Sequence, residues 1–129
     1  MHQNKNNLFE DIIGQSFAVD FLQSVLTKRQ FCPAYLFSGP NGVGRKLAAL
    51  RFFEGLVNNG NTSIRDRNRL ATLNHPDLLW VEPTFIRQGK LITKSIAEKE
   101  NMPGQSLPQI RLNQIRDIAR FLGKEPIES

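Results

Sequence analysis

The fold of this chain is decided by the stretch between residues 34 and 46, which reads Ala34-Tyr35-Leu36-Phe37-Ser38-Gly39-Pro40-Asn41-Gly42-Val43-Gly44-Arg45-Lys46. Its first four residues are apolar or aromatic and turn formers follow them, which is typical of a buried strand. After Gly44 the apolar residues recur at helical spacing, on a face made of Ala49, Phe52, Phe53 and Leu56. The sequence therefore predicts a strand, a glycine loop and a helix in direct succession.

The glycines of this loop have the spacing of a Walker A motif, G-x-x-x-x-G-K-[ST], between a strand and a helix as that motif requires. Glycine allows the backbone to wrap closely, so that its N–H groups point at phosphate oxygens, and the following helix adds its positive N-terminal end. We therefore predict a phosphate-binding type of loop formed by Gly39, Pro40, Asn41, Gly42, Val43, Gly44, Arg45 and Lys46.

The last two of these positions depart from the motif, because Arg45 replaces its lysine and Lys46 its serine or threonine. Arginine carries a planar fork instead of a compact point charge, so the contact with phosphate changes. Lysine offers no lone pair to Mg²⁺ and adds a positive charge, so the sequence predicts no metal ligand and no catalytic residue here. Two interpretations stay open: a loop kept for the fold alone, or a loop that still binds ATP without hydrolysing it.

Around this stretch, helical periodicity predicts a helix from about Phe17 to Gln30, because Pro33 then disfavours helical geometry. A short helix is predicted over residues 64–73. The apolar run at residues 77–82 predicts a second buried strand, parallel to the first because a helical crossover separates the two.

Further on, Gln88-Gly89 between two apolar runs predicts a β-hairpin of residues 85–87 and 90–92. Residues 98–109 predict a loop, since they contain two prolines and a glycine. A last helix is predicted over residues 110–122, with its buried face made of Leu112, Ile115, Ala119 and Leu122.

Composition indicates one globular domain: 129 residues, 40% hydrophobic, with nine Phe. The single cysteine, Cys32, excludes an internal disulfide, and no segment has the roughly 18 apolar residues of a membrane span, so we expect a cytoplasmic protein. The net charge of +5 and the alternating Arg65, Arg67 and Arg69 keep a basic DNA-binding module open as an alternative, although a solvated face is the favoured explanation of these arginines.

Four stretches together resemble the clamp-loader branch of the AAA+ superfamily: residues 9–15, 34–44, 75–78 and 110–122. The resemblance implies an α/β fold, a P-loop AAA+ three-layer core with a parallel sheet. Residues 1–129 would form the N-terminal part of one such domain, ending before the Walker B strand and the arginine finger. It also implies that Ile12 and Ile13 contact the adenine of a bound nucleotide.

Within this branch, His75-Pro76-Asp77 and Glu82-Pro83 resemble subunits of the delta-prime type more than the ATP-hydrolysing subunit. The resemblance implies a largely non-hydrolysing structural arm of the DNA polymerase III clamp loader. Its partners would be the other clamp-loader subunits, with the sliding clamp and primer-template DNA reached through the complex. An ATP-hydrolysing AAA+ motor stays the alternative.

The interval between Asn58 and Asn74 lacks the four cysteines that hold a structural zinc in this branch, so no zinc is expected. His75 has no second ligand nearby in the sequence, and we assign it a structural role beside the turn before the second strand.

Overall fold

The computed structural model describes residues 7–100 and 107–127, and these form two compact units, one reaching up to His75 and the other covering Pro76–Ile127. Most of the predicted polar start of the chain, and residues 101–106 of the predicted loop, lie outside the described residues. Within the described ranges, no helix is long and apolar enough to cross a membrane.

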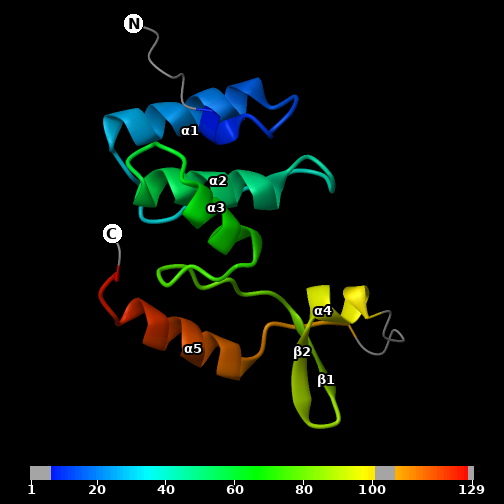
Figure 1. Ribbon diagram of the computed structural model, residues 1–129. Helices are drawn as coiled ribbons and strands as arrows, with labels where there is room; N and C mark the ends of the chain where they lie inside the picture. Colours follow the sequence, from blue (N-terminus) through cyan, green and yellow to red (C-terminus); the bar gives the residue numbers. More distant parts are fainter. Residues whose placement is uncertain (1–6, 101–106, 128–129) are drawn as a thin grey trace, which may run out of the picture. The chain divides into compact units, whose positions relative to one another are not determined.

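The first unit consists of the 3₁₀ helix η1 (Asn7–Phe9) and the helices α1 (Ser16–Lys28), α2 (Arg45–Val57) and α3 (Ile64–Ala71), shown in Figure 1. The three helices predicted in this region are confirmed. Helix α1 ends at Arg29, whose backbone is left-handed (φ 52°) and whose N–H donates to the Val25 carbonyl oxygen at 2.9 Å. The chain therefore leaves helical geometry before it reaches Pro33.

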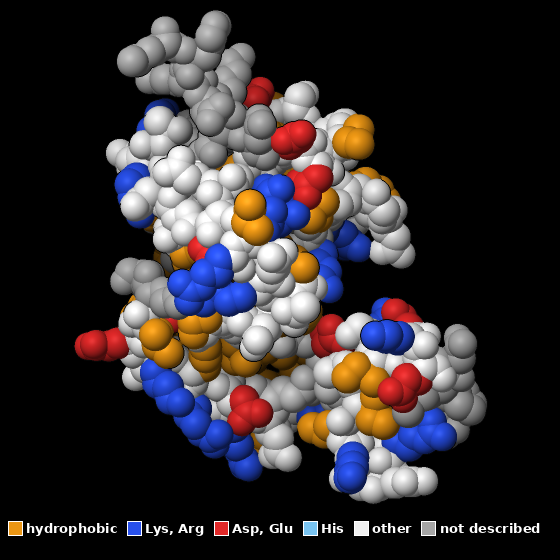
Figure 2. All heavy atoms as spheres, in the orientation of Figure 1, with side chains coloured by type: hydrophobic (Ala, Val, Ile, Leu, Met, Phe, Trp, Pro, Cys, Tyr) orange, Lys and Arg blue, Asp and Glu red, His pale blue; other side chains and the backbone are white. Residues whose placement is uncertain are grey.

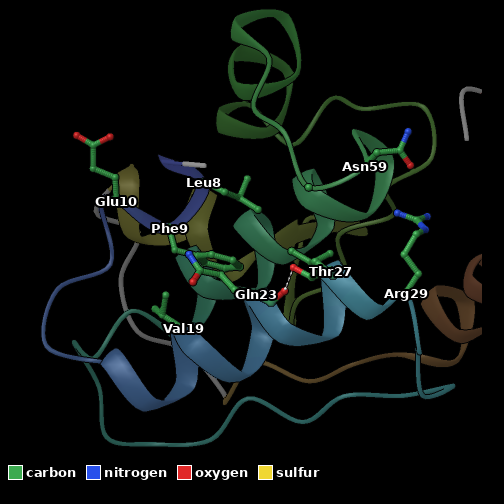
Figure 3. A pocket seen from close by; sticks show the side chains of 10 residues that line it. Leu8, Phe9, Glu10, Val19, Gln23, Thr27, Arg29 and Asn59 are labelled. Atoms are coloured by element: carbon green, nitrogen blue, oxygen red, sulfur yellow. Dashed lines mark hydrogen bonds between the residues drawn. The ribbon is translucent and has the colours of Figure 1, made fainter. Parts of the chain in front are cut away.

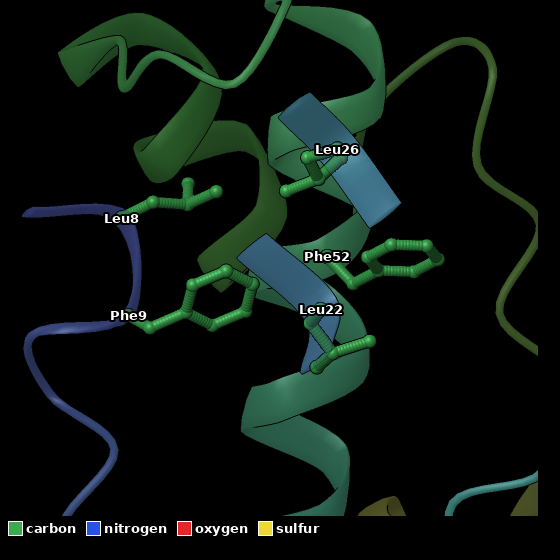
Figure 4. Packing of buried hydrophobic residues seen from close by; sticks show 5 residues of the cluster. All are labelled: Leu8, Phe9, Leu22, Leu26 and Phe52. Atoms are coloured by element: carbon green, nitrogen blue, oxygen red, sulfur yellow. The ribbon is translucent and has the colours of Figure 1, made fainter. Parts of the chain in front are cut away.

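The core of this unit forms where η1, α1 and α2 meet (Figure 4), and its buried residues are Leu8, Phe9, Leu22, Leu26 and Phe52. Burying side chains of this size contributes roughly 1.5–3 kcal/mol each relative to exposure. Helix α2 approaches closely at Gly55, which is buried between Leu8 and Leu26. The start of the chain and the helix after the glycine loop thus share one core.

The predicted strand at residues 34–37 is extended, and its side chains alternate as in a strand. The rings of Tyr35 and Phe37 lie 5.0 and 6.4 Å from that of Phe52, whereas Leu36 points outward and is 92% exposed. However, neither this segment nor residues 77–82 pairs with another strand among the described residues. The parallel sheet predicted from them is not shown, because neither segment has the hydrogen-bonded neighbour that defines a sheet.

The second unit contains the predicted hairpin, formed by β1 (Thr84–Arg87) and β2 (Lys90–Thr93) in antiparallel register, with Phe85 opposite Ile92. Its turn residues Gln88 and Gly89 both have positive φ, 50° and 75°, as a two-residue hairpin turn requires. The hairpin prediction is therefore confirmed.

Helix α4 (Lys94–Lys99) follows the hairpin and was not predicted. The Thr93 hydroxyl accepts a hydrogen bond from the Ile96 N–H and so caps this helix. The loop predicted from residue 98 is wrong at Glu98 and Lys99, which are helical. Further along, Gln109 pairs with Thr84 of β1 through two backbone hydrogen bonds of 2.9 and 3.0 Å.

The last helix, α5 (Leu112–Leu122), is confirmed, but its predicted buried face is wrong. The residues predicted as buried are exposed, with Leu112, Ile115 and Leu122 at 62, 52 and 75%. No residue of α5 is buried, and the half-buried Gln114 donates to the Glu82 carbonyl oxygen at 2.8 Å and accepts from the Thr84 hydroxyl at 2.9 Å. Lys and Arg side chains form a row over this helix in Figure 2.

The close approach at Gly55 predicts the effect of adding one methyl group. In Gly55→Ala the new Cβ would lie 2.6 Å from Leu26 Cδ1 and 2.7 Å from Leu8 Cδ2, both on buried side chains. Overpacking of about 1–3 kcal/mol outweighs the helix-propensity gain of about 1 kcal/mol, so the free energy of unfolding in urea should fall.

Gly123→Ala is the matched control, because its Cβ would meet only backbone oxygens at an ordinary 3.6 Å. A Gly55→Ala variant as stable as this control would contradict the described packing of α1 on α2.

Candidate functional site

The glycine loop leads from the extended segment at residues 34–37 into α2. Gly42 and Gly44 have φ of 88° and 91°, in the left-handed region where a side chain is strained, which explains glycine at both positions. At the end of the loop, Arg45 Nη2 donates a hydrogen bond of 2.8 Å to Asn41 Oδ1. The guanidinium that replaces the motif's lysine therefore closes the loop onto itself.

A cavity of about 240 Å³ opens between α1, the extended segment and the start of α2. Ile12, Val43, Gly44 and Arg45 line it, so the structure brings the predicted adenine contact and the end of the glycine loop to one place. The other predicted residues lie outside its lining: Ile13, Gly39, Pro40, Asn41, Gly42 and Lys46. Ile13 is 87% exposed, which separates it from its neighbour Ile12.

The rest of this lining is mostly apolar, and it comes from Gln15, Ala18, Val19, Phe21, Leu22, Tyr35, Leu36, Phe37, Ser38 and Ala48. Such a surface can hold a flat ring, with the Arg45 guanidinium beside it for an anionic group. Among the described residues that line the cavity there is no Asp or Glu. The cavity therefore supplies neither a carboxylate ligand for Mg²⁺ nor a carboxylate base for hydrolysis.

An ionic network that the sequence did not predict links the segment before the cavity to α2 and α3. Arg51 of α2 places Nε 3.1 Å from both carboxylate oxygens of Asp11 and Nη2 2.7 Å from Oδ2. Arg51 also pairs with Glu54 at 3.4 Å, and Arg67 of α3 reaches Glu54 at 3.3 Å and the Leu8 carbonyl oxygen at 3.0 Å. The hydrogen bonds from Arg51 lower the pKa of Asp11.

Only part of this network left a signal in the sequence. Arg51 and Glu54 stand at i and i+3 in a largely apolar part of the helix, a spacing at which opposite charges can pair. Nothing local indicated Asp11, since it lies forty positions before Arg51.

Of the three arginines of α3, Arg65, Arg67 and Arg69, the last two form ion pairs and so do not belong to a simple solvated face. Arg67 binds Glu54 and Leu8, and Arg69 forms an ion pair with Asp66, which lowers the pKa of that carboxyl. His75 is buried, its ring 5.2 Å from that of Phe53 and its Nε2 3.9 Å from Asp66 Oδ1. This burial agrees with the structural role predicted for His75.

A second and larger hollow, of about 900 Å³, lies between η1, α1 and the turn after α2 (Figure 3). Its side chains include Glu10, Gln23, Thr27, Arg29 and Asn59, and the Thr27 hydroxyl donates to the Gln23 carbonyl oxygen at 2.8 Å. It shares only Val19 with the cavity at the glycine loop. Helix α1 thus has a different hollow on each side, and the predicted site residues belong to one of them.

In the second unit, polar groups gather around Glu82, at the end of the predicted second strand. Its carboxylate accepts from the Ser95 N–H at 2.9 Å and Trp80 Nε1 at 3.3 Å, and also from the Ser95 hydroxyl. Burial raises the pKa of this carboxyl, but the hydrogen bonds from Ser95, Thr93 and Trp80 together outweigh that effect and lower the pKa of Glu82. These contacts join the start of α4 to the segment before β1, which is a structural task.

Comparison with known proteins adds three matches. The family model described as DNA polymerase III, delta subunit, matches residues 14–129. DNA polymerase III subunit tau of Bacillus subtilis (strain 168) is 46% identical over 50 residues, 39% of this chain and 9% of that protein. Protein STICHEL of Arabidopsis thaliana is 40% identical over 50 residues, 39% of this chain and 4% of that protein. The match spans less than a tenth of either relative, and no solved structure matches the chain.

The lowered pKa values of Asp11 and Asp66 predict how stability depends on pH. A carboxyl whose pKa is lower in the folded state stabilises the fold above the pKa of an unfolded Asp, about 3.9. This stability is lost as the pH falls through the folded pKa. We therefore expect the melting temperature to fall between about pH 5 and pH 2, and to fall less in the D11N/D66N double variant. Equal slopes in the two proteins would contradict the ion pairs described.

Proposed function

The chain belongs to the DNA polymerase III, delta subunit family, and from this premise we propose that it is a delta-prime-type arm of a clamp loader, without ATP hydrolysis of its own. Family membership supports a role in DNA replication within a multi-subunit assembly. The finer assignment to the delta-prime type rests on His75-Pro76-Asp77, on Glu82-Pro83 and on the altered glycine loop.

The single observation that carries the proposal is the hydrogen bond that Arg45 makes within the loop. Arg45 occupies the lysine position of the motif and donates a hydrogen bond of 2.8 Å to Asn41, and Lys46 stands where a hydroxyl would hold Mg²⁺. The lining of the neighbouring cavity contributes no carboxylate among the residues described. These features favour an arm without ATP turnover over an ATP-hydrolysing motor.

For the nucleotide itself, we propose binding without metal at the cavity shared by Ile12 and Gly44. Its volume of about 240 Å³ is below the roughly 300–1,000 Å³ of most small-molecule sites. The apolar wall fits a base and Arg45 fits one phosphate group, whereas nothing in the lining fits a metal-bound triphosphate. We expect such binding to be weak.

The proposed partners are the other clamp-loader subunits in a hetero-oligomer, with the sliding clamp and primer-template DNA reached through that complex, in the cytoplasm. A stand-alone DNA-binding module is the weaker alternative, because Arg67 and Arg69 are engaged in ion pairs. The row of basic side chains over α5 in Figure 2 fits contact with a phosphate backbone inside the assembly.

Fluorescence titration with mant-ATP, with and without Mg²⁺, tests the loop. We expect Mg²⁺ to leave the affinity of the unaltered chain unchanged. The double variant Arg45→Lys with Lys46→Thr restores both motif positions, and its affinity should rise by about tenfold or more when Mg²⁺ is added.

Arg45→Lys alone is the matched control, since it restores the lysine but no metal ligand, and Mg²⁺ should have no effect on it. Tight Mg²⁺-dependent binding together with phosphate release by the unaltered chain would overturn the proposal in favour of the motor.

Assembly tests the other half of the proposal. We expect the chain to co-elute in size-exclusion chromatography with the other DNA polymerase III subunits of its source organism, and to do so equally well with the Arg45→Lys and Lys46→Thr substitutions. Failure to co-elute, combined with salt-sensitive DNA binding by the chain alone, would favour the DNA-binding module.

A further inference from the structure

The segment before the candidate site is attached to α2 and α3 at two points. Arg67 holds the Leu8 carbonyl oxygen at 3.0 Å, and Arg51 holds the Asp11 carboxylate with a fork of 3.1, 3.1 and 2.7 Å. Both arginines also contact Glu54, which is fully buried. The stretch from Leu8 to Asp11 is therefore fixed to the helices at each end.

Ile12 follows this attachment directly. Its N–H donates to the Phe9 carbonyl oxygen at 3.0 Å, and its half-buried side chain packs on the core and lines the cavity. Arg51 and Arg45 lie on the same helix, about 9 Å apart along its axis at 1.5 Å per residue. The Asp11 to Arg51 contact thus fixes one wall of the cavity relative to the helix that starts at the other wall.

We propose that Asp11 and Arg51 are positioning residues of the candidate nucleotide site, whose paired hydrogen bonds set the distance between Ile12 and the glycine loop. This inference rests on the proposed function in treating the cavity as a nucleotide site. The two residues act through their neighbours, since neither is part of the cavity lining.

The exposure of the pair distinguishes positioning from simple stabilisation. The Asp11 side chain is 38% exposed and that of Arg51 is 13% exposed. Ion pairs with a solvated partner contribute little to stability, because water screens the attraction and the side chains lose entropy. The geometry of the fork remains directional all the same. Weakening the pair should therefore change the cavity more than the melting temperature.

The experiment compares D11N, R51K and D11E with the unaltered full chain. D11N removes the charge, R51K keeps the charge but loses the fork, and D11E keeps the carboxylate. D117N is the matched control, because it makes the same Asp-to-Asn change beside an arginine, Arg120, in the exposed pair on α5. The readouts are the amide NMR signals of Gly42 and Gly44, the methyl signals of Ile12, the melting temperature, and mant-ATP affinity without Mg²⁺.

We expect D11N and R51K to shift the signals of Ile12 and both glycines while the melting temperature changes little. Their mant-ATP affinity should fall about fivefold, the low end of typical couplings between sites. D11E should restore most of the signal positions, and D117N should leave them unchanged. Should D11N fail to fold, R51K and D11E decide between the outcomes.

Unshifted Ile12 and glycine signals in D11N and R51K would overturn the positioning role, and so would a large loss of stability with unshifted signals, since that marks a merely structural pair. Absence of mant-ATP binding by the unaltered chain would overturn the nucleotide part of the proposed function. The NMR signals would still decide the positioning role in that case, so the two failures are distinguishable.

Discussion

The buried carboxylate of Glu54 is the constraint on which the first unit depends. It is fully buried, and a charge in that position is strongly destabilising unless it is paired and hydrogen-bonded. Its partners, Arg51 and Arg67, come from α2 and α3, and each reaches back to the segment at Leu8 to Asp11. Through these two arginines, one carboxylate links the start of the chain to α2 and α3.

Helix α2 connects this ionic network with the glycine loop. Its C-terminal half carries Phe52, Glu54 and Gly55 into the core, and its first residue, Arg45, closes the loop through Asn41. The loop keeps positive φ at Gly42 and Gly44, while Arg45 and Lys46 stand at the positions where the motif has lysine and a hydroxyl residue. The proposed arm of a clamp loader, which leaves ATP turnover to other subunits, would need the loop's fold without its metal ligand.

Local signals in the sequence were sufficient for the helices and the hairpin. Periodic apolar residues predicted α1, α2 and α5, a polar stretch with weak periodicity predicted α3, and Gln88-Gly89 predicted the turn. Features that depend on distant residues were not predictable in this way. No residue of α5 is buried, and its half-buried side includes Gln114, which binds Glu82 and Thr84 some thirty positions away. The parallel sheet would need a neighbouring strand that the described residues do not supply.

The candidate site shows the same division. The glycine spacing predicted the loop, and the structure brings Val43, Gly44 and Arg45 to the cavity with Ile12. Sequence could not separate Ile12 from Ile13, because both are apolar neighbours and only the fold decides which one turns inward. The contact of Arg51 with Asp11 joins two residues that no local pattern connects.

The hydrogen bond from Arg45 to Asn41 has a further consequence for the proposed clamp-loader arm. A loop whose conformation is supported by its own side chains would need no bound nucleotide to keep its shape, whether the cell is rich in ATP or in ADP. Its neighbours would respond to the energy state of the cell, while this subunit would present them with a surface that does not vary. Constancy, rather than turnover, would then be its contribution to each loading cycle.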